Sequence, residues 1–216
     1  MADSALQRKN MVESQIRPSD ITDRRITSAM SEIAREPFLP QGLDKTLAYM
    51  DGAIPLGQDR AMLAPRTLAR LLQLAAIEAQ DKVMIVGAGS GYSAAIAARM
   101  AKSVVAVESN ASLLEIAKST LAGLPNVTIA AGDLAAGHGA GAPYDVILIE
   151  GAVEDVPETL IGQLGQGGRL VAIEAGAGIG RAIVLTKSAA AVSKRVAFDA
   201  AGPMLPGFAR AKGFVF

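Results

Sequence analysis

Three alternating glycines, Gly87, Gly89 and Gly91, stand between an apolar, β-branched run and an alanine-rich run. This order predicts a strand over 82–86, a tight turn and a helix over 91–100. Glycine allows a ligand to approach the main chain where any Cβ would clash. The free N–H groups at the start of the helix can then face that ligand. The arrangement is typical of a nucleotide site at the carboxyl end of a parallel strand.

Two acids follow where the next strands should end at the same edge of the sheet. Glu108 ends the run 103–107, about 20 residues after the turn, where a carboxylate can accept hydrogen bonds from a ribose diol. Asp133 follows the third run. Tyr92 stands where a dinucleotide fingerprint has its last glycine, so the spacing favours an adenosyl cofactor over NAD. The alternatives are a structural β–α turn, a solvated strand-end Glu108 and an Asx-turn role for Asp133.

Around this turn, strand-like and helix-like patterns alternate along the chain. Such alternation predicts an α/β fold with a mostly parallel, seven-stranded sheet and helices on both faces. The last segments, 181–187, 195–198 and 212–216, should pair antiparallel at one edge because no helices separate them. We expect strands at 82–86, 103–107, 127–130, 145–149, 168–173, 181–187 and 210–216, and helices at 91–100, 110–122 and 156–164.

Residues 1–79 are expected to form a helical extension, packed on a core of residues 80–216 that carries the glycine turn, as one compact unit. Amphipathic spacing and capping residues predict the helices of this extension. We expect helices over 3–17, 23–35 and 66–79 and an extended segment over 54–58.

The composition excludes several kinds of binding site and partner. Half of the 216 residues are apolar, and Lys plus Arg equal Asp plus Glu at 21 each. Zero net charge gives no bulk attraction to nucleic acid or to a membrane surface. The absence of cysteine and the single histidine exclude disulfides and multi-histidine metal sites. No run of about 18 apolar residues exists, and the first residues lack a signal-peptide pattern, so we expect a cytoplasmic protein.

Six stretches carry a resemblance to one protein family. They are Asn10–Ile26, Arg35-Glu-Pro-Phe-Leu-Pro40, Ile54-Pro-Leu-Gly-Gln58, Val86-Gly-Ala-Gly-Ser-Gly-Tyr92, Ala142-Pro-Tyr-Asp-Val-Ile-Leu-Ile149 and Leu164-Gly-Gln-Gly-Gly-Arg-Leu-Val171. The chain resembles the protein-L-isoaspartate (D-aspartate) O-methyltransferases over nearly its whole length. The resemblance implies a Rossmann-like class I methyltransferase fold, S-adenosyl-L-methionine as cofactor, and protein repair by methyl transfer to a protein or peptide carboxylate.

The resemblance also implies roles for individual residues. The three glycines would pack against the methionine part of the cofactor, and Glu108 would hold the ribose hydroxyls. Asp133 and Leu134 would lie beside the adenine. Glu150 ends the fourth strand, where such enzymes often place a substrate-facing residue, although a plain strand-end acid is an equal alternative. The full cofactor-binding set is Gly87, Ala88, Gly89, Gly91, Glu108, Ser109, Asp133, Leu134 and Glu150.

Two positions depart from the family pattern. An acid that engages the methionyl ammonium normally stands two residues before the first glycine, and here that residue is Ile85. We therefore expect weak cofactor binding. The substrate loop normally carries a hydroxyl against the substrate carboxylate, and here Leu63 takes its place. Arg60 could anchor the carboxylate instead, but a solvated loop arginine is the alternative interpretation.

These departures leave three functional hypotheses. The first is an isoaspartyl repair methyltransferase. The second is a methyltransferase-fold protein that acts on another acceptor, or on none. The third is a non-catalytic homologue with weak or no cofactor binding. Because the altered loop cannot hold a carboxylate through Leu63, we expect little or no isoaspartyl activity. The sequence leaves the oligomeric state open.

Overall fold

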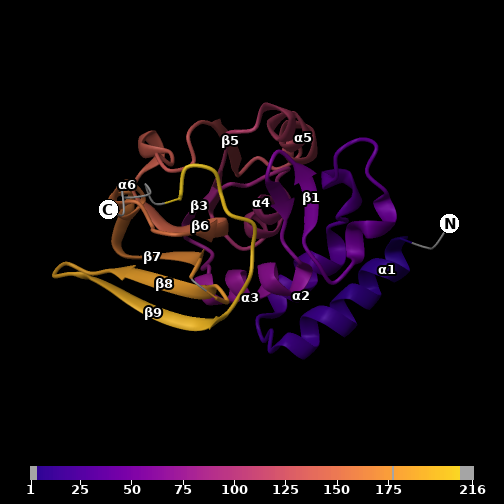
Figure 1. Ribbon diagram of the computed structural model, residues 1–216, viewed down its shortest axis with the longest axis horizontal. Helices are drawn as coiled ribbons and strands as arrows, with labels where there is room; N and C mark the ends of the chain where they lie inside the picture. Colours follow the sequence, from indigo (N-terminus) through magenta and orange to yellow (C-terminus); the bar gives the residue numbers. More distant parts are fainter. Residues whose placement is uncertain (1–3, 177, 210–216) are drawn as a thin grey trace, which may run out of the picture.

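The computed structural model describes residues 4–176 and 178–209. Its centre is a seven-stranded sheet in the order β5-β4-β3-β6-β7-β8-β9 (Figure 1). The first five strands of that order are parallel, and β8 and β9 are antiparallel additions at one edge. The strands are β3 (Lys82–Val86), β4 (Ser103–Glu108), β5 (Val127–Ala131), β6 (Tyr144–Val153), β7 (Leu164–Glu174), β8 (Arg181–Lys187) and β9 (Val192–Asp199). The predicted α/β architecture is confirmed.

Alternate residues of the buried strands divide the core into two layers. Ile85 and Leu148 face a large cluster shared with the N-terminal helices, α4 and α5. Val86 and Ile149 face a smaller cluster that includes Leu160 of α6. The helices are α1 (Ser4–Met11), α2 (Arg24–Glu32), α3 (Pro65–Ala75), α4 (Tyr92–Ala98), α5 (Ala111–Leu121) and α6 (Glu158–Gly162).

Local sequence signals account for most helix starts. The side chain of Asp23 accepts a hydrogen bond from the Arg25 N–H and caps α2. Pro65 occupies the first turn of α3, where its missing N–H costs nothing. The predicted first helix is divided: α1 continues into a π-helical turn, η1 (Val12–Ile16), and a 3₁₀ turn, η2 (Arg17–Ser19). Two further 3₁₀ turns, η3 (Glu36–Phe38) and η4 (Lys45–Tyr49), lead to the next strand, and η5 (Gly139–Gly141) precedes β6.

Two strands outside the main sheet form a hairpin, β1 (Ile54–Gly57) with β2 (Arg60–Met62). Gln58 and Asp59 join them with φ angles of 49° and 58°. Two consecutive positive φ angles are the conformation of a tight hairpin turn. The turn brings Arg60 back toward the main sheet.

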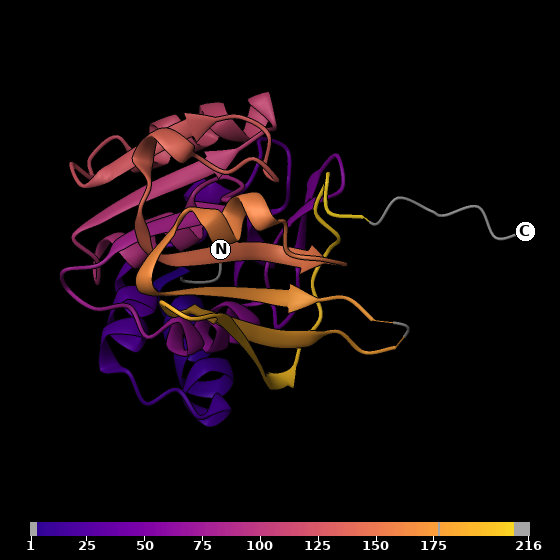
Figure 2. The same cartoon turned by 90° about the vertical axis from the view of Figure 1, so that its left-hand side faces the viewer.

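The segment after β9 crosses the carboxyl ends of the central strands, as the yellow trace shows in Figures 1 and 2. We call residues 203–208 the strap. Ala152 of β6 donates its N–H to Pro203 O at 2.8 Å and accepts the Leu205 N–H at 2.9 Å. Phe208 O accepts the N–H of Glu154 at 3.1 Å. These bonds fix the strap against the edge where the sequence predicts a ligand site.

Strand bounds also differ from the expectations. Strands β6 and β7 extend beyond their predicted ends, to Val153 and Glu174. The seventh strand is β9, whereas the strand expected at 210–216 lies outside the described residues. None of the helices in residues 4–176 and 178–209 is long and apolar enough to cross a membrane.

Candidate functional site

The glycine turn joins β3 to α4 in the predicted place. Gly87, Gly89 and Gly91 have φ angles of 75°, 57° and 97°, a region that favours glycine. The turn's N–H groups bond within the protein: Gly87 and Ala88 donate to Val107 O at 2.9 and 3.0 Å, and Gly91 donates to Ala88 O at 2.9 Å. The turn is therefore held in shape by β4 beside it.

Glu108 lies at the end of β4 and is surrounded by donors. Its Oε2 accepts the Gly89 N–H at 2.7 Å. Its Oε1 accepts the N–H groups of Ser109 at 2.9 Å and Asn110 at 3.0 Å. The side chain is only 1% exposed. The carboxylate thus joins the glycine turn to the start of α5.

Arg60 completes the shell around Glu108. Its Nη2 donates to Glu108 Oε2 and to Gly87 O, both at 2.7 Å. The arginine is 4% exposed, so the solvated loop arginine considered from the sequence is wrong. Its Nε and Nη1 are buried and have no hydrogen-bond partner among residues 4–176 and 178–209. The hairpin therefore places the buried guanidinium of Arg60 against Glu108, the residue expected to hold a ribose. Two of the guanidinium nitrogens keep unused hydrogen-bond donors.

Leu205 of the strap covers the same turn. A Cβ built on Gly87 would lie 3.1 Å from Leu205 Cδ1 and 3.0 Å from Arg60 Nη2. At Gly151, a Cβ would lie 2.6 Å from Leu205 Cγ and 2.9 Å from Pro203 O. On Gly89, it would meet Leu56 Cδ1 of the hairpin at 3.3 Å. The turn is thus packed against side chains of this chain.

The residues predicted to lie near adenine are at the same edge. Gly132 donates its N–H to Glu108 O at 3.1 Å, which brings the ends of β4 and β5 together. Asp133 is exposed and its Oδ1 accepts the Ala135 N–H at 3.0 Å, as an Asx turn does. Leu134 is buried in the smaller core cluster with Leu205 and Phe208 of the strap. The strap therefore supplies apolar side chains to the expected adenine side.

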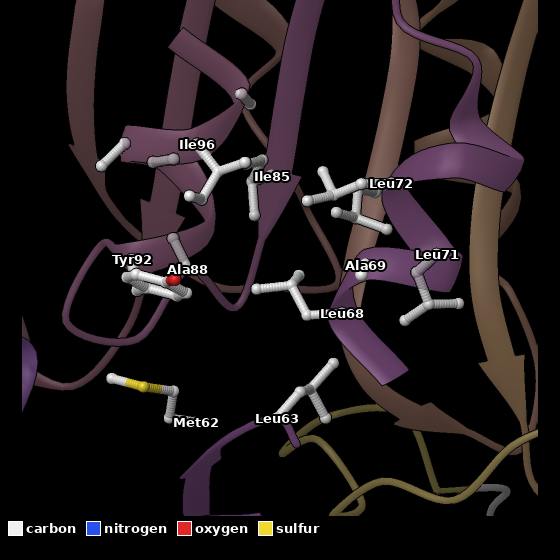
Figure 3. Close-up of a cluster of buried hydrophobic side chains, with 14 of the residues drawn as sticks. Met62, Leu63, Leu68, Ala69, Leu71, Leu72, Ile85, Ala88, Tyr92 and Ile96 are labelled. Carbon is white, nitrogen blue, oxygen red and sulfur yellow. The ribbon is translucent and has the colours of Figure 1, made fainter. Parts of the chain in front are cut away.

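Two positions that depart from the family pattern are core residues. Ile85 is fully buried, and Figure 3 shows it between Ile96 and Leu72. Leu63 is 1% exposed and lies below Leu68 in the same view. Its carbonyl accepts a hydrogen bond from Nη2 of the buried Arg35 at 3.1 Å. The stretch around Leu63 is therefore held in the interior rather than exposed as an apolar loop.

Glu150 is buried in β6 beside the site. Burial raises the pKa of Glu150 to about 8, while the Ser93 hydroxyl that donates to Oε2 and the charge of Arg60 act in the opposite direction. Near neutral pH the carboxyl is therefore largely protonated. A neutral acid close to Arg60 and Glu108 limits the buried charge of this region.

A cleft of about 600 Å³ lies on the outer side of Arg60. The hairpin contributes Pro55, Asp59 and Ala61, and the strap contributes Pro203 and Leu205. Among residues 4–176 and 178–209, Arg60 is the only cationic residue that lines it. Arg60 therefore borders both the glycine turn and an open, mostly apolar cleft.

Comparison with known proteins identifies the family. Residues 6–196 match the family model of Protein-L-isoaspartate(D-aspartate) O-methyltransferase (PCMT). The chain belongs to this family. The protein-L-isoaspartate O-methyltransferase of Methanoculleus marisnigri is 39% identical over 168 residues, covering 77% of this chain and 76% of the relative. That of Methylorubrum populi is 40% identical over 172 residues, covering 79% and 80%.

Solved structures agree with the PCMT assignment. A protein-L-isoaspartate O-methyltransferase superposes with a TM-score of 0.81 at 26% identity, over 93% of this chain and 66% of that one. A Plasmodium falciparum protein of the family, in complex with S-adenosyl-L-homocysteine, has a TM-score of 0.79 at 18% identity, over 92% and 97%. The second likeness supports the fold alone. The matched residues 6–196 end before the strap begins.

Methyl transfer from S-adenosylmethionine is the activity of the PCMT family. In the conformation described here, this chain's residues do not fit that cofactor. Glu108 is saturated by Arg60 and backbone donors, Leu205 covers Gly87, and Ile85 offers no charge. The roles predicted for the site residues remain predictions, although the structure brings their positions to one edge.

The sequence reasoning missed Leu205 and the partner of Arg60. The strap lies in a stretch rich in proline and glycine, which predicts only turns. Arg60 and Glu108 are 48 positions apart, so no spacing rule links them. The only signal in the sequence was that they carry opposite charges, one in the altered loop and the other at the end of a strand that leads to the site.

Proposed function

We propose that this chain transfers a methyl group from S-adenosylmethionine to a protein or peptide carboxylate, from a site that must open before it can bind the cofactor. One observation carries the proposal. In a chain of the PCMT family, the glycine turn, Glu108 and Asp133 converge at the carboxyl edge of the parallel sheet. Ligand sites of open α/β folds occur at this edge.

The acceptor end of the site also supports a carboxylate substrate. The cleft beside Arg60 is mostly apolar, and Arg60 is the one cationic residue that lines it in the part of the chain that the structure describes. A guanidinium can hold a carboxylate through two parallel hydrogen bonds. Leu63 cannot replace a hydroxyl there, because its side chain has no hydrogen-bonding group and is buried in the core. We therefore expect low isoaspartyl activity while Arg60 stays on Glu108.

The second candidate is a non-catalytic homologue. The Arg60–Glu108 pair favours it, because a permanently closed pair would exclude the ribose. Ile85 favours it too, because its apolar side chain is buried in the core and cannot bind the methionyl ammonium. The two candidates differ in whether the closed conformation can open.

The test is methyl transfer from labelled S-adenosylmethionine to an isoaspartyl peptide, run beside its normal aspartyl twin. Slow transfer that is confined to the isoaspartyl peptide supports the proposal. Calorimetry with S-adenosylhomocysteine is run on the same preparation. Absence of both binding and transfer at millimolar ligand would establish the non-catalytic alternative.

A further inference from the structure

We propose that Arg60 is a positioning residue with two alternative partners: Glu108 in the closed state and the acceptor carboxylate in the open state. Its movement would couple the cofactor site to the acceptor cleft. The inference rests on the proposed function. Its starting point is the location of Arg60, which contacts the glycine turn through Gly87 O and also lines the cleft.

Glu108 cannot serve Arg60 and a ribose together. Its two oxygens already accept the N–H groups of Gly89, Ser109 and Asn110, and Arg60 adds the fourth bond. A carboxylate offers about four lone-pair sites. The three N–H donors are parts of the main chain, whereas Arg60 is a side chain. A ribose hydroxyl that donates to Glu108 must therefore displace Arg60.

The closed position leaves Arg60 incompletely bonded. Only Nη2 has partners, while Nε and Nη1 are buried without any among the described residues. Buried, unsatisfied donors on a charged group oppose the conformation that creates them. Once a ribose occupies Glu108, a second position of the Arg60 side chain in which these donors are bonded is therefore favoured.

The cleft provides that position. It is bounded on one side by the hairpin and on the other by the strap, and Arg60 lines it from the inner end. Asp59 also lines the cleft but is exposed to solvent, so water screens its attraction for Arg60. A substrate carboxylate that enters the apolar cleft would meet Arg60 with less screening. Leu205 packs on Gly87 beside Arg60, so a ligand that reaches the glycine turn must also displace this side chain of the strap.

If Arg60 moves in this way, S-adenosylhomocysteine and an isoaspartyl peptide should each strengthen the binding of the other. These two ligands cannot react, so their binding can be measured at equilibrium. S-adenosylhomocysteine should tighten the binding of an isoaspartyl peptide by about fivefold or more, and the peptide should tighten S-adenosylhomocysteine by the same factor. In Arg60→Met, S-adenosylhomocysteine should bind about tenfold tighter than in the wild type, since its competitor for Glu108 is gone. Peptide affinity should fall, and the coupling factor should approach one.

Titration calorimetry measures the affinity for each ligand, with and without the other ligand present. Arg66→Met is the matched control. Arg66 is exposed and pairs with Asp51 at 3.0 Å, so its loss should leave both affinities and their coupling unchanged. Equal S-adenosylhomocysteine affinity in the wild type and Arg60→Met would overturn the inference while leaving the proposed function intact. If neither the wild type nor Arg60→Met bound S-adenosylhomocysteine, the inference and the proposed function would both be overturned.

A second variant tests the inference even if Arg60→Met does not fold. Leu205→Ala removes the strap side chain over Gly87 without changing charge, and it should also bind S-adenosylhomocysteine more tightly than the wild type. In the wild type, S-adenosylhomocysteine should speed hydrogen exchange at the Leu205 N–H, which now donates to Ala152 O. Unchanged affinity in Leu205→Ala, or slower exchange of this N–H, would contradict the inference.

Discussion

Arg60 Nη2 lies 2.7 Å from Glu108 Oε2, and both side chains are almost wholly buried. Breaking a buried ion pair by removing one partner typically costs about 3–5 kcal/mol. Glu108 would keep three main-chain N–H donors after the loss of Arg60. We therefore expect Arg60→Met to lose less stability than this range, which makes the variant usable for binding studies.

Gly151→Ala should release the strap. The new methyl group would lie 2.6 Å from Leu205 Cγ and 2.9 Å from Pro203 O, and the latter is main chain that cannot simply rotate away. Overpacking of this kind costs about 1–3 kcal/mol. Limited proteolysis should cut the variant faster near the strap. Gly123→Ala, which meets no atom within 4 Å among the described residues, is the control. Equal cleavage rates in Gly151→Ala and the wild type would show that the strap is not held at Gly151.

Ile85→Asp should destabilise the protein without improving cofactor binding. Sequence reasoning alone suggests that an acid here would recover a lost salt link. That gain requires the end of the strand to be open to the ligand, whereas Ile85 is fully buried among the apolar side chains of the core. An unsatisfied buried polar group costs about 1–3 kcal/mol and a charged one costs more. Denaturant unfolding should report a loss of about 3 kcal/mol or more, against about 1 kcal/mol for Ile85→Val. Tighter S-adenosylhomocysteine binding by a folded Ile85→Asp would contradict this account.

Glu150 should make stability fall as pH rises. Burial raises its folded-state pKa from the ordinary 4.5 to about 8, so between these values the folded protein holds a proton that the unfolded chain has lost. The resulting stabilisation is complete below about pH 4.5 and disappears as pH rises through about 8. The full change is on the order of a few kcal/mol. Ser93, Arg60, Arg35 and Glu108 are the groups that act on Glu150.

Glu150→Gln supplies the check on this pH dependence. The amide cannot ionise, yet its oxygen can still accept from Ser93. Unfolding free energies measured from pH 5 to pH 8 should decline for the wild type and decline less for the variant. Parallel curves for the two proteins would show that Glu150 does not titrate in this range.

The fold could be predicted because its signals are local. The apolar run 82–86, the glycine turn and the cap at Asp23 each specify an element through neighbouring residues. The site could be predicted only in part. Converging strand ends place Glu108 and Asp133 together by topology, but the burial of Arg60 depends on a hairpin packing against the sheet. Leu205 reaches Gly87 only because a proline-rich segment crosses the sheet edge. Contacts of this kind join distant parts of the chain without any periodic pattern.

A structure of the wild-type protein with S-adenosylhomocysteine tests the central claim most directly. In that complex, a ribose hydroxyl should bond to Glu108, Arg60 should lie in the cleft beside Pro55 and Ala61, and Leu205 should no longer cover Gly87. The measured quantity is the distance between Arg60 Nη2 and Glu108 Oε2, which should rise from 2.7 Å to beyond hydrogen-bonding range. A complex in which the ligand occupies the glycine turn while Arg60 remains bonded to Glu108 would contradict the account.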